Sequence, residues 1–457
     1  MGRLESAGWL LYQSAFAAVL PLAAPLLAAR RGFSHYRTTL RGRLAQALPA
    51  PAAAPGALWI HAVSVGEVGV AATLGRLLPP GLPLCVTTVT PTGQAQARRL
   101  FPPPAAVGYL PFDLAFAVRR FFDAIAPRLL LLCEGDYWPL VLREARRRRL
   151  PVVVVNGRMS DRAFARQKHL GKLNRLFYGA VDFFAMQTAE DRERLLALGV
   201  EPAKVAVGGN LKFDARPPAP KPELEAAIEN LAAGRPILVA GSTLEGEEEA
   251  LLAALGELGR EKLLLVLAPR HPERWDAVEK LVEGRGFSLL RRSRLDLGPG
   301  AAAPAGKAPE VLLLDSLGEL AAVYRLGAAA FVGGTLVPKG GHNPIEPAHF
   351  GVPVLVGPSM FNFREIGERF ARAQAWRRLD HARQLAPALA ELLADPAAAA
   401  ALGGRARALL EENRGAAART LELIQPFLTE AFGKEASSMP SAMPPPSRPG
   451  PQRGAQA

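Results

Sequence analysis

Short apolar runs alternate with amphipathic segments along most of the chain, after a Pro-rich linker at residues 49–55. This alternation is typical of βα units, in which buried parallel strands are joined by helices. In the first half it predicts strands at residues 58–63, 84–88, 128–133, 152–156 and 181–186. In the second half it predicts strands at residues 237–240, 263–268, 311–314, 329–332 and 353–356.

Two Rossmann-like, doubly wound α/β domains account for this pattern. A Pro-rich stretch at residues 217–222 marks their junction, so we assign residues 32–215 to a first domain and residues 216–432 to a second. Ligands of such sheets bind outside the carboxyl ends of the strands, which predicts a cleft between the domains. Residues 433–457 are rich in Pro, Ser and Gly, a composition that favours a disordered tail.

Residues 1–31 predict a membrane anchor. Residues 9–29 are uncharged and mostly apolar, and as a helix they would extend about 31 Å at ~1.5 Å per residue. Pro21 and Pro25 would kink that helix, so a half-inserted anchor suits the sequence as well as a full span. Arg30 and Arg31 follow at once, which opposes a cleaved signal peptide and keeps the bulk of the chain cytoplasmic. A buried helix of the soluble core is the alternative.

Composition narrows the possible partners. The 457 residues include 55 Lys and Arg against 42 Asp and Glu, and the net charge of +13 favours anionic partners. Aromatic residues make up 7% of the chain and are not interleaved with basic ones, so nucleic acid is not an expected partner. The two cysteines, Cys85 and Cys133, lie in predicted buried strands, which excludes a disulfide framework and a thiolate metal site.

Carboxylates and a lysine follow the predicted strands of the first domain. Glu67 comes just after the first strand, where it is either a general base or a partner of the helix dipole. Glu134 and Asp136 follow a strongly apolar strand together with Trp138, unless Asp136 is only a helix cap and Trp138 only a core residue. Lys212 precedes the linker, where it either contacts a phosphate or carboxylate or pairs with Asp214 on the surface.

The second domain offers groups that suit a nucleotide. Arg270 directly follows a predicted strand, and the run from Gly333 to Gly341 forms a glycine-rich turn whose backbone amides are candidates to cradle a phosphate. Glu346, one helical turn further, would accept hydrogen bonds from ribose hydroxyls. Neither GxGxxG nor GxxxxGK[ST] occurs, which disfavours dinucleotide and ATP-loop proteins. The histidines lack metal-ligand spacing, so no metal site is expected.

In order, these motifs resemble those of the 3-deoxy-D-manno-octulosonic acid (Kdo) transferase family, the glycosyltransferases of lipid A. The resemblance covers residues 5–430, and its motifs are SVGE at residues 64–67, TPTG at 90–93, the block at 134–139, NLKFD at 210–214, STLEGEE at 242–248, PRHPER at 269–274, LGEL at 317–320 and GGHNPIEP at 340–347. It implies a GT-B fold, an inner-membrane anchor and cytoplasmic catalytic domains. It also implies transfer of Kdo from CMP-Kdo to the lipid A precursor (lipid IVA) at an anionic membrane surface, with inversion, no cofactor and no catalytic metal.

The resemblance also implies residue roles. Glu67 would take the proton of the acceptor hydroxyl, and Glu134 and Lys212 would support the transition state. The positions that match the CMP-binding residues are Pro269, Arg270, Leu317, Gly318, Glu319, Asn343, Pro344, Ile345 and Glu346. The family's usual Glu-Thr-Glu is replaced here by Glu134, Gly135 and Asp136, which leaves the role of Asp136 open.

Two other classes of protein remain open at this point. A different membrane-associated GT-B enzyme that uses a UDP-sugar would share the two-domain pattern, and it should bind UDP in preference to CMP. A non-enzymatic anion-binding protein would account for the charge but not for the ordered carboxylates at strand ends.

Overall fold

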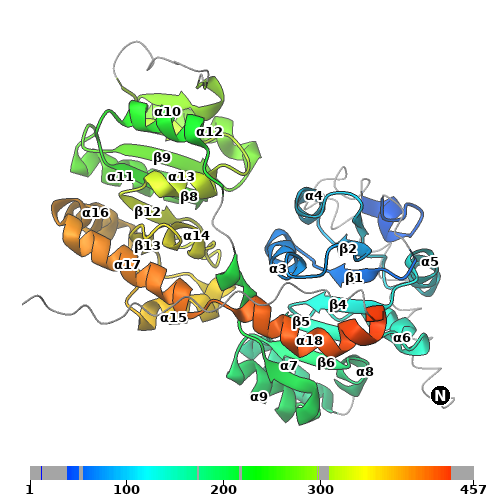
Figure 1. Ribbon diagram of the computed structural model, residues 1–457. Helices are drawn as coiled ribbons and strands as arrows, with labels where there is room; N and C mark the ends of the chain where they lie inside the picture. Colours follow the sequence, from blue (N-terminus) through cyan, green and yellow to red (C-terminus); the bar gives the residue numbers. More distant parts are fainter. Residues whose placement is uncertain are drawn as a thin grey trace, which may run out of the picture. The chain divides into compact units, whose positions relative to one another are not determined.

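The computed structural model describes residue 12 and residues 39–50, 55–171, 174–215, 219–295, 297 and 308–433. The chain folds into two compact units, each built on its own parallel sheet (Figure 1). The first unit contains Met1–Ala215 and Gly415–Ala457, and the second contains Arg216–Arg414. The fold class predicted from the pattern, two parallel-sheet α/β domains, is therefore confirmed.

The first sheet has seven parallel strands in the order β3-β2-β1-β4-β5-β6-β7. Its strands are β1 (Leu58–His61), β2 (Leu84–Thr88), β3 (Ala106–Tyr109), β4 (Leu129–Cys133), β5 (Val152–Gly157), β6 (Phe183–Met186) and β7 (Val205–Val207). The intervening helices are α3 (Val65–Gly75), α4 (Pro91–Leu100), α5 (Ala115–Ile125), α6 (Pro139–Arg147), α7 (Asp161–Leu170), α8 (Asn174–Tyr178) and α9 (Ala189–Ala197). A short 3₁₀ helix, η3 (Leu211–Asp214), ends the first passage of the chain through this unit.

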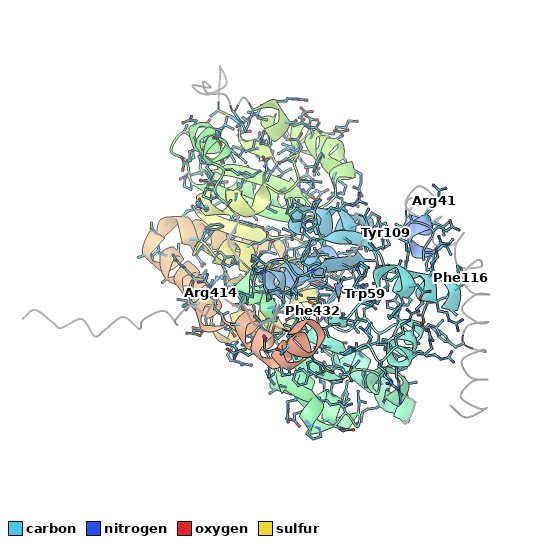
Figure 2. All side chains as sticks on the ribbon, turned by 45° about the vertical axis from the view of Figure 1, so that its right-hand side comes forward. Arg41, Trp59, Tyr109, Phe116, Arg414 and Phe432 are labelled. Atoms are coloured by element: carbon cyan, nitrogen blue, oxygen red, sulfur yellow. The ribbon has the colours of Figure 1, made fainter. Side chains whose placement is uncertain are left out.

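Both faces of the first sheet are covered. Leu58 and Ile60 of β1 pack in one hydrophobic cluster, whereas Trp59, between them, packs in the other. Successive side chains of a strand point to opposite faces, so this split means that β1 is buried on both sides. Figure 2 labels Trp59 in the first unit. Its side chain is fully buried and meets the Phe122 ring edge-on, with the ring centroids 5.3 Å apart.

The second sheet also has seven parallel strands, in the order β10-β11-β9-β8-β12-β13-β14. Its strands are β8 (Ile237–Thr243), β9 (Leu264–Pro269), β10 (Leu289–Arg291), β11 (Val311–Leu313), β12 (Ala329–Val332), β13 (Val354–Val356) and β14 (Arg377–Arg378). Its helices are α10 (Pro222–Ala232), α11 (Glu247–Leu258), α12 (Trp275–Gly284), α13 (Leu320–Val323), α14 (Ile345–Ala348), α15 (Arg364–Arg372), α16 (Leu385–Ala394) and α17 (Pro396–Glu412).

All ten predicted strands are present, with ends shifted by a few residues. Four further strands, β3, β7, β10 and β14, escaped the sequence analysis. Each of these four lies at an edge of its sheet. Edge strands are short, and they are less fully covered than the inner strands. They therefore lack the continuous apolar run that identifies a buried parallel strand.

The last helix, α18 (Ala416–Phe432), corrects the predicted domain boundary. We assigned residues 216–432 to the second domain, but residues from Gly415 onward belong to the first unit. Ile424 and Leu428 of α18 are buried in the same hydrophobic cluster as β1. The Asp214 carboxylate, at the end of the first passage, accepts hydrogen bonds from Gly415 N (2.7 Å) and Ala417 N (2.5 Å). Asp214 thus caps the N-terminal amides of α18, while Lys212 pairs with Glu134, so the alternative of a surface salt bridge between Lys212 and Asp214 is wrong.

The predicted anchor and tail lie outside the described residues, apart from Tyr12 and Gly433. Tyr12 packs against the core of the first unit, where its hydroxyl donates to Asp113 Oδ2 at 2.8 Å. Among the described residues, no single helix has the length and apolarity to cross a membrane, and one sharply bent pair of segments, Ala382–Ala394 with Pro396–Phe432, meets those two criteria together.

Candidate active site

Glu67 lies in the first turn of α3, just beyond the carboxyl end of β1. Its half-buried carboxylate accepts hydrogen bonds from Val63 N (2.9 Å) and Ser64 Oγ (3.3 Å). Burial raises the pKa of Glu67 from 4.5 to about 7, and the charges of Glu134 and Asp136 act in the same direction. A carboxyl group with this pKa exchanges its proton near neutral pH, as a general base must.

Glu134 and Lys212 form an ion pair at the same edge of the first sheet. Lys212 Nζ lies 2.7 Å from Glu134 Oε1, and Arg158 Nε lies 2.8 Å from Glu134 Oε2. The Glu134 side chain is only 9% exposed, so two cations compensate a nearly buried carboxylate. The structure therefore brings together two predicted residues that lie far apart in the chain, and it adds Arg158, which the sequence analysis missed.

The backbone at Glu134 is held in an unfavourable conformation. Glu134 has φ 60° and the following Gly135 has φ 118°, so the chain turns sharply as it leaves β4. Asn156 of β5, itself at φ 54°, donates from Nδ2 to Glu134 Oε1 at 3.4 Å and accepts from Leu211 N at 2.9 Å. Asn156 thereby connects the Glu134 turn to the segment that carries Lys212. A lone Asn at the end of an otherwise apolar strand was the signal that could have revealed it.

Asp136 is neither a helix cap nor a surface turn residue. Its Oδ2 accepts a hydrogen bond from Trp138 Nε1 (2.6 Å) and lies 3.3 Å from His61 Nε2. The N-terminal amides of α6 are capped instead by Asp113, which accepts from Leu140 N at 3.0 Å. Burial alone would raise the pKa of Asp136, but the hydrogen bonds from His61 and Trp138 hold it below its ordinary value. The prediction that Asp136 only caps a helix is therefore wrong.

In the second unit, Arg270 and Glu346 approach each other from different strand ends. Arg270 follows Pro269, the last residue of β9, and its side chain is exposed, while Glu346 lies in α14 and receives a hydrogen bond from Asn343 Nδ2 at 3.4 Å. Burial raises the pKa of Glu346, and the positive charge of Arg270 acts against that rise. Asn343 also accepts from Ile345 N at 3.1 Å and so orients the turn that carries Glu346.

His342 precedes Asn343 in the same turn, and the sequence analysis named it only as part of the GGHNPIEP motif. Its Nε2 is buried and has no hydrogen-bond partner among the described residues. Burial lowers the pKa of His342 to about 4, and the charge of Arg270 acts in the same direction. The imidazole is therefore neutral at pH 7, and its buried Nε2 has an unused hydrogen-bonding capacity.

Part of the glycine turn after β12, whose amides the sequence analysis named as candidates to cradle a phosphate, is already engaged within the protein. The amides of Gly334, Thr335 and Leu336 donate to the fully buried carboxylate of Glu247, at 2.7, 2.9 and 3.0 Å. A fourth amide, Leu244 N, donates to the same carboxylate at 2.9 Å. Glu247 thus occupies the place of an anion at residues 334–336, and whether the rest of the run to Gly341 holds a phosphate stays a prediction.

Within the predicted CMP-binding residues 317–319, the Glu319 carboxylate binds other side chains of the protein. Glu319 accepts hydrogen bonds from both Arg292 Nε and Nη2 at 2.9 Å and from Ser316 Oγ. Burial alone would raise the pKa of Glu319, but those hydrogen bonds hold it below its ordinary value. The carboxylate is thus engaged, whereas the Leu317 side chain is 76% exposed and Gly318 adopts φ 81°. Whether this turn holds CMP stays a prediction.

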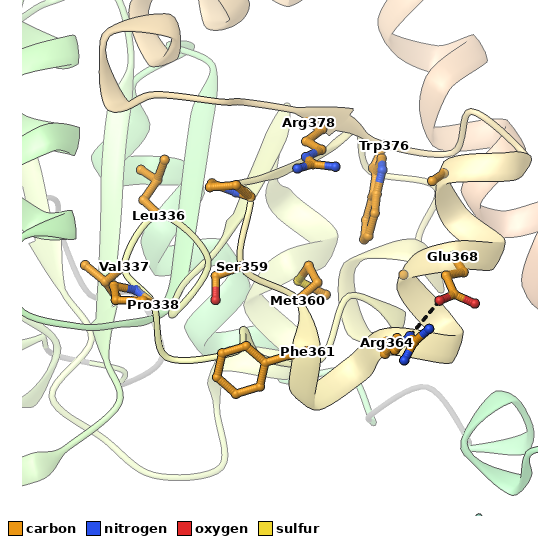
Figure 3. A pocket seen from close by; sticks show the side chains of 14 residues that line it. Leu336, Val337, Pro338, Ser359, Met360, Phe361, Arg364, Glu368, Trp376 and Arg378 are labelled. Atoms are coloured by element: carbon orange, nitrogen blue, oxygen red, sulfur yellow. Dashed lines mark hydrogen bonds and ion pairs between the residues drawn. The ribbon is translucent and has the colours of Figure 1, made fainter. Parts of the chain in front are cut away.

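A mostly apolar cavity of about 610 Å³ adjoins the glycine turn (Figure 3). Leu336 and Val337 line one side, and Met360, Phe361 and Trp376 line the other. Gly340 N donates to Ser359 Oγ at 3.0 Å, so the wall of the cavity also supports the turn. None of the predicted CMP-binding residues lines it. Among the described residues, no three His, Cys, Asp or Glu side chains gather in a way that suits a metal ion.

The two parallel sheets define the fold class, two α/β units of the GT-B type. A UDP-N-acetylglucosamine 2-epimerase from Neisseria meningitidis has a similar fold, with a TM-score of 0.52 and 13% identity over 82% of this chain and 99% of that one. Residues 30–215 match the family model described as 3-deoxy-D-manno-octulosonic-acid transferase (kdotransferase).

Two relatives named 3-deoxy-D-manno-octulosonic acid transferase extend the match to most of the chain. The protein from Haemophilus influenzae is 35% identical over 82% of this chain and 88% of its own length. The protein from Bordetella pertussis is 37% identical over 85% of this chain and 90% of its own length. The chain belongs to the Kdo transferase family of glycosyltransferases, as the motifs suggested.

Proposed function

We propose that this enzyme transfers Kdo from CMP-Kdo to the lipid A precursor, with inversion and without a catalytic metal. Glu67 carries the proposal, because its position and its pKa of about 7 suit a group that removes a proton from a sugar hydroxyl. Family membership supports Kdo as the transferred sugar. The Glu67 site, the family membership and the motif resemblance together support this proposal.

The chemistry is a single displacement. Glu67 takes the proton of the acceptor hydroxyl, whose oxygen forms a bond to the anomeric carbon of Kdo. The bond from that carbon to the phosphate oxygen breaks, and CMP leaves with the bonding electrons. Attack from the face opposite the phosphate inverts the anomeric centre. Lys212 and Glu134 would support the developing charge, since a fixed ion pair needs little reorganisation during the reaction.

Donor binding is assigned to the second unit. Arg270 would balance the negative charge of the phosphate, and Glu346 would accept hydrogen bonds from the ribose hydroxyls. His342 adds a neutral ring nitrogen within the same group of side chains. These groups supply charge and hydrogen bonds to the leaving CMP, and this is the role that a metal ion has in other transferases.

The test is reconstitution with purified protein. We expect incubation with CTP, Kdo, a Kdo-activating enzyme and lipid IVA to increase the acceptor mass by whole Kdo units, and we expect the rate to persist in EDTA. UDP-sugars in place of CTP and Kdo should give no product. Transfer from a UDP-sugar would contradict the assignment of the donor, and loss of activity in EDTA that added Mg²⁺ restores would contradict the metal-independent mechanism.

A further inference from the structure

A line of hydrogen bonds leads from the core of the first unit to Asp136. Trp59 Nε1 donates to Thr87 Oγ1 at 2.8 Å, and Thr87 Oγ1 lies 2.9 Å from His61 Nδ1. His61 Nε2 lies 3.3 Å from Asp136 Oδ2. Trp59, Thr87 and His61 are each at most 1% exposed. The line therefore begins inside the sheet and ends at the edge where Glu67 lies.

The two ends of this line determine the direction of its bonds. An indole N–H only donates, so Thr87 Oγ1 accepts from Trp59. An ionised carboxylate only accepts, so His61 Nε2 carries a proton and donates it to Asp136, and in the neutral ring Nδ1 accepts from the Thr87 hydroxyl. The alternative tautomer would donate from Nδ1 to Thr87 O, which lies 3.2 Å away. In that tautomer the Nε2 lone pair would face the Asp136 carboxylate, and the two hydrogen-bond acceptors would repel each other.

Asp136 is held by one oxygen only. Both N–H donors, from His61 and Trp138, reach Oδ2, and Oδ1 has no hydrogen-bond partner among the described residues. The Asp136 side chain is 36% exposed, in contrast to the 1% of His61. A carboxylate fixed through one oxygen by buried donors presents the other oxygen at a defined position.

Asp136 lies close to the group that removes the proton. β1 and β4 are neighbours in the sheet, so the residues that follow them meet at the same edge. The negative charge of Asp136 also raises the pKa of Glu67. A second carboxylate at this edge repels phosphate and favours hydroxyl groups, which donate hydrogen bonds and carry no charge.

We propose that Asp136 is a specificity residue that binds the acceptor sugar, its Oδ1 accepting a hydrogen bond from a hydroxyl adjacent to the one that Glu67 deprotonates. This proposal rests on the proposed function, because it takes the acceptor to be a sugar. His61 acts as a positioning residue, since it holds the carboxylate without touching the substrate.

The test compares Asp136→Asn with Asp123→Asn, a control at a surface carboxylate that is 67% exposed. Binding of lipid IVA in detergent micelles is measured directly, together with CMP binding, melting temperature and turnover. Asn has an amide in place of the free oxygen, so we expect acceptor affinity to fall by about 10- to 100-fold. CMP affinity and melting temperature should stay at wild-type values, and Asp123→Asn should change nothing.

Two further variants separate recognition from a structural role. Asp136→Glu, which keeps the charge, should recover part of the lost acceptor affinity, and His61→Phe should weaken acceptor binding less than Asp136→Asn does. Unchanged acceptor affinity in Asp136→Asn would overturn the proposal, as would equal losses for acceptor and CMP. If acceptor binding falls in the variant while the wild type transfers no Kdo, the role of Asp136 stands and the proposed reaction is wrong.

Discussion

Lys212 Nζ and Glu134 Oε1 lie 2.7 Å apart, although one belongs to a short 3₁₀ helix before the linker and the other to the turn after β4. Both side chains are mostly buried, so neither charge is well compensated by water alone. We expect a double-mutant cycle with Lys212→Met and Glu134→Gln to give a coupling of about 1 to 3 kcal/mol in urea unfolding.

The control pair for this cycle is Arg364 and Glu368, joined at 2.8 Å with both side chains more than half exposed. Their coupling should not exceed about 0.5 kcal/mol, because the pair is solvated. Equal coupling for the two pairs would mean that burial adds nothing at Glu134.

If Glu67 is the general base, its titration should appear in the pH dependence of kcat/KM. Only the deprotonated carboxylate accepts a proton, so kcat/KM should rise through a pKa of about 7 and level off above it. Glu67→Gln should lower turnover by roughly 10²- to 10⁴-fold at pH 8. A variant within a few-fold of wild type would leave Glu67 only its helix-dipole role.

The same pKa makes a prediction about stability. The folded state holds the Glu67 proton more tightly than the unfolded chain, so this group's stabilisation is complete below pH 4.5 and is lost as the pH rises through about 7. We therefore expect the melting temperature of Glu67→Gln, relative to that of wild type, to be higher at pH 8 than at pH 5. A higher relative melting temperature at pH 5 would mean that folding lowers the pKa of Glu67.

Glu247 should be among the most sensitive positions for stability in the second unit. Glu247→Ala leaves four backbone amides without their acceptor, and we expect a loss of about 3 kcal/mol or more in urea unfolding. Glu245→Ala, at an exposed position of the same loop, should change stability by less than about 0.5 kcal/mol. Similar effects at both positions would mean that the amides find water instead.

CMP recognition should reside in the second unit. Arg270→Ala and Glu346→Ala should each weaken CMP binding by about 1 to 3 kcal/mol, the value of a hydrogen bond to a charged group, as measured by calorimetry. Lys280→Ala, on the exposed surface of α12, serves as the control for a general loss of charge. Wild-type affinity in both site variants would remove them from the donor site, and tighter binding of UDP than of CMP would favour a different donor.

Deletion of residues 1–31 should release the protein from membranes while CMP affinity is retained. The deletion also removes the Tyr12 hydroxyl, which donates to Asp113, so Tyr12→Phe is the matched control for lost stability. We expect Tyr12→Phe to remain with the membrane fraction. Full-length protein in the soluble fraction would contradict the anchor.

The sequence by itself determined the parallel-sheet class and the ten inner strands, because a strand covered on both faces must be apolar at every position. It also placed Glu67, Glu134 and Arg270 at strand ends, where short polar runs interrupt apolar ones, and Lys212 just before the linker. Edge strands such as β14, whose two residues are both arginines, carry no such signal, since pairing with β13 and not burial makes them strands.

Only the tertiary structure decided which groups meet. The helix α18 returns to the first unit because its apolar face completes that core, and no local pattern shows which of two cores a helix completes. Glu247 lies in the STLEGEE motif, yet only the fold shows that its carboxylate accepts hydrogen bonds from amides of a turn far along the chain. His61 and Asp136 likewise become partners because β1 and β4 are neighbours in the sheet, and strand order depends on packing between distant segments.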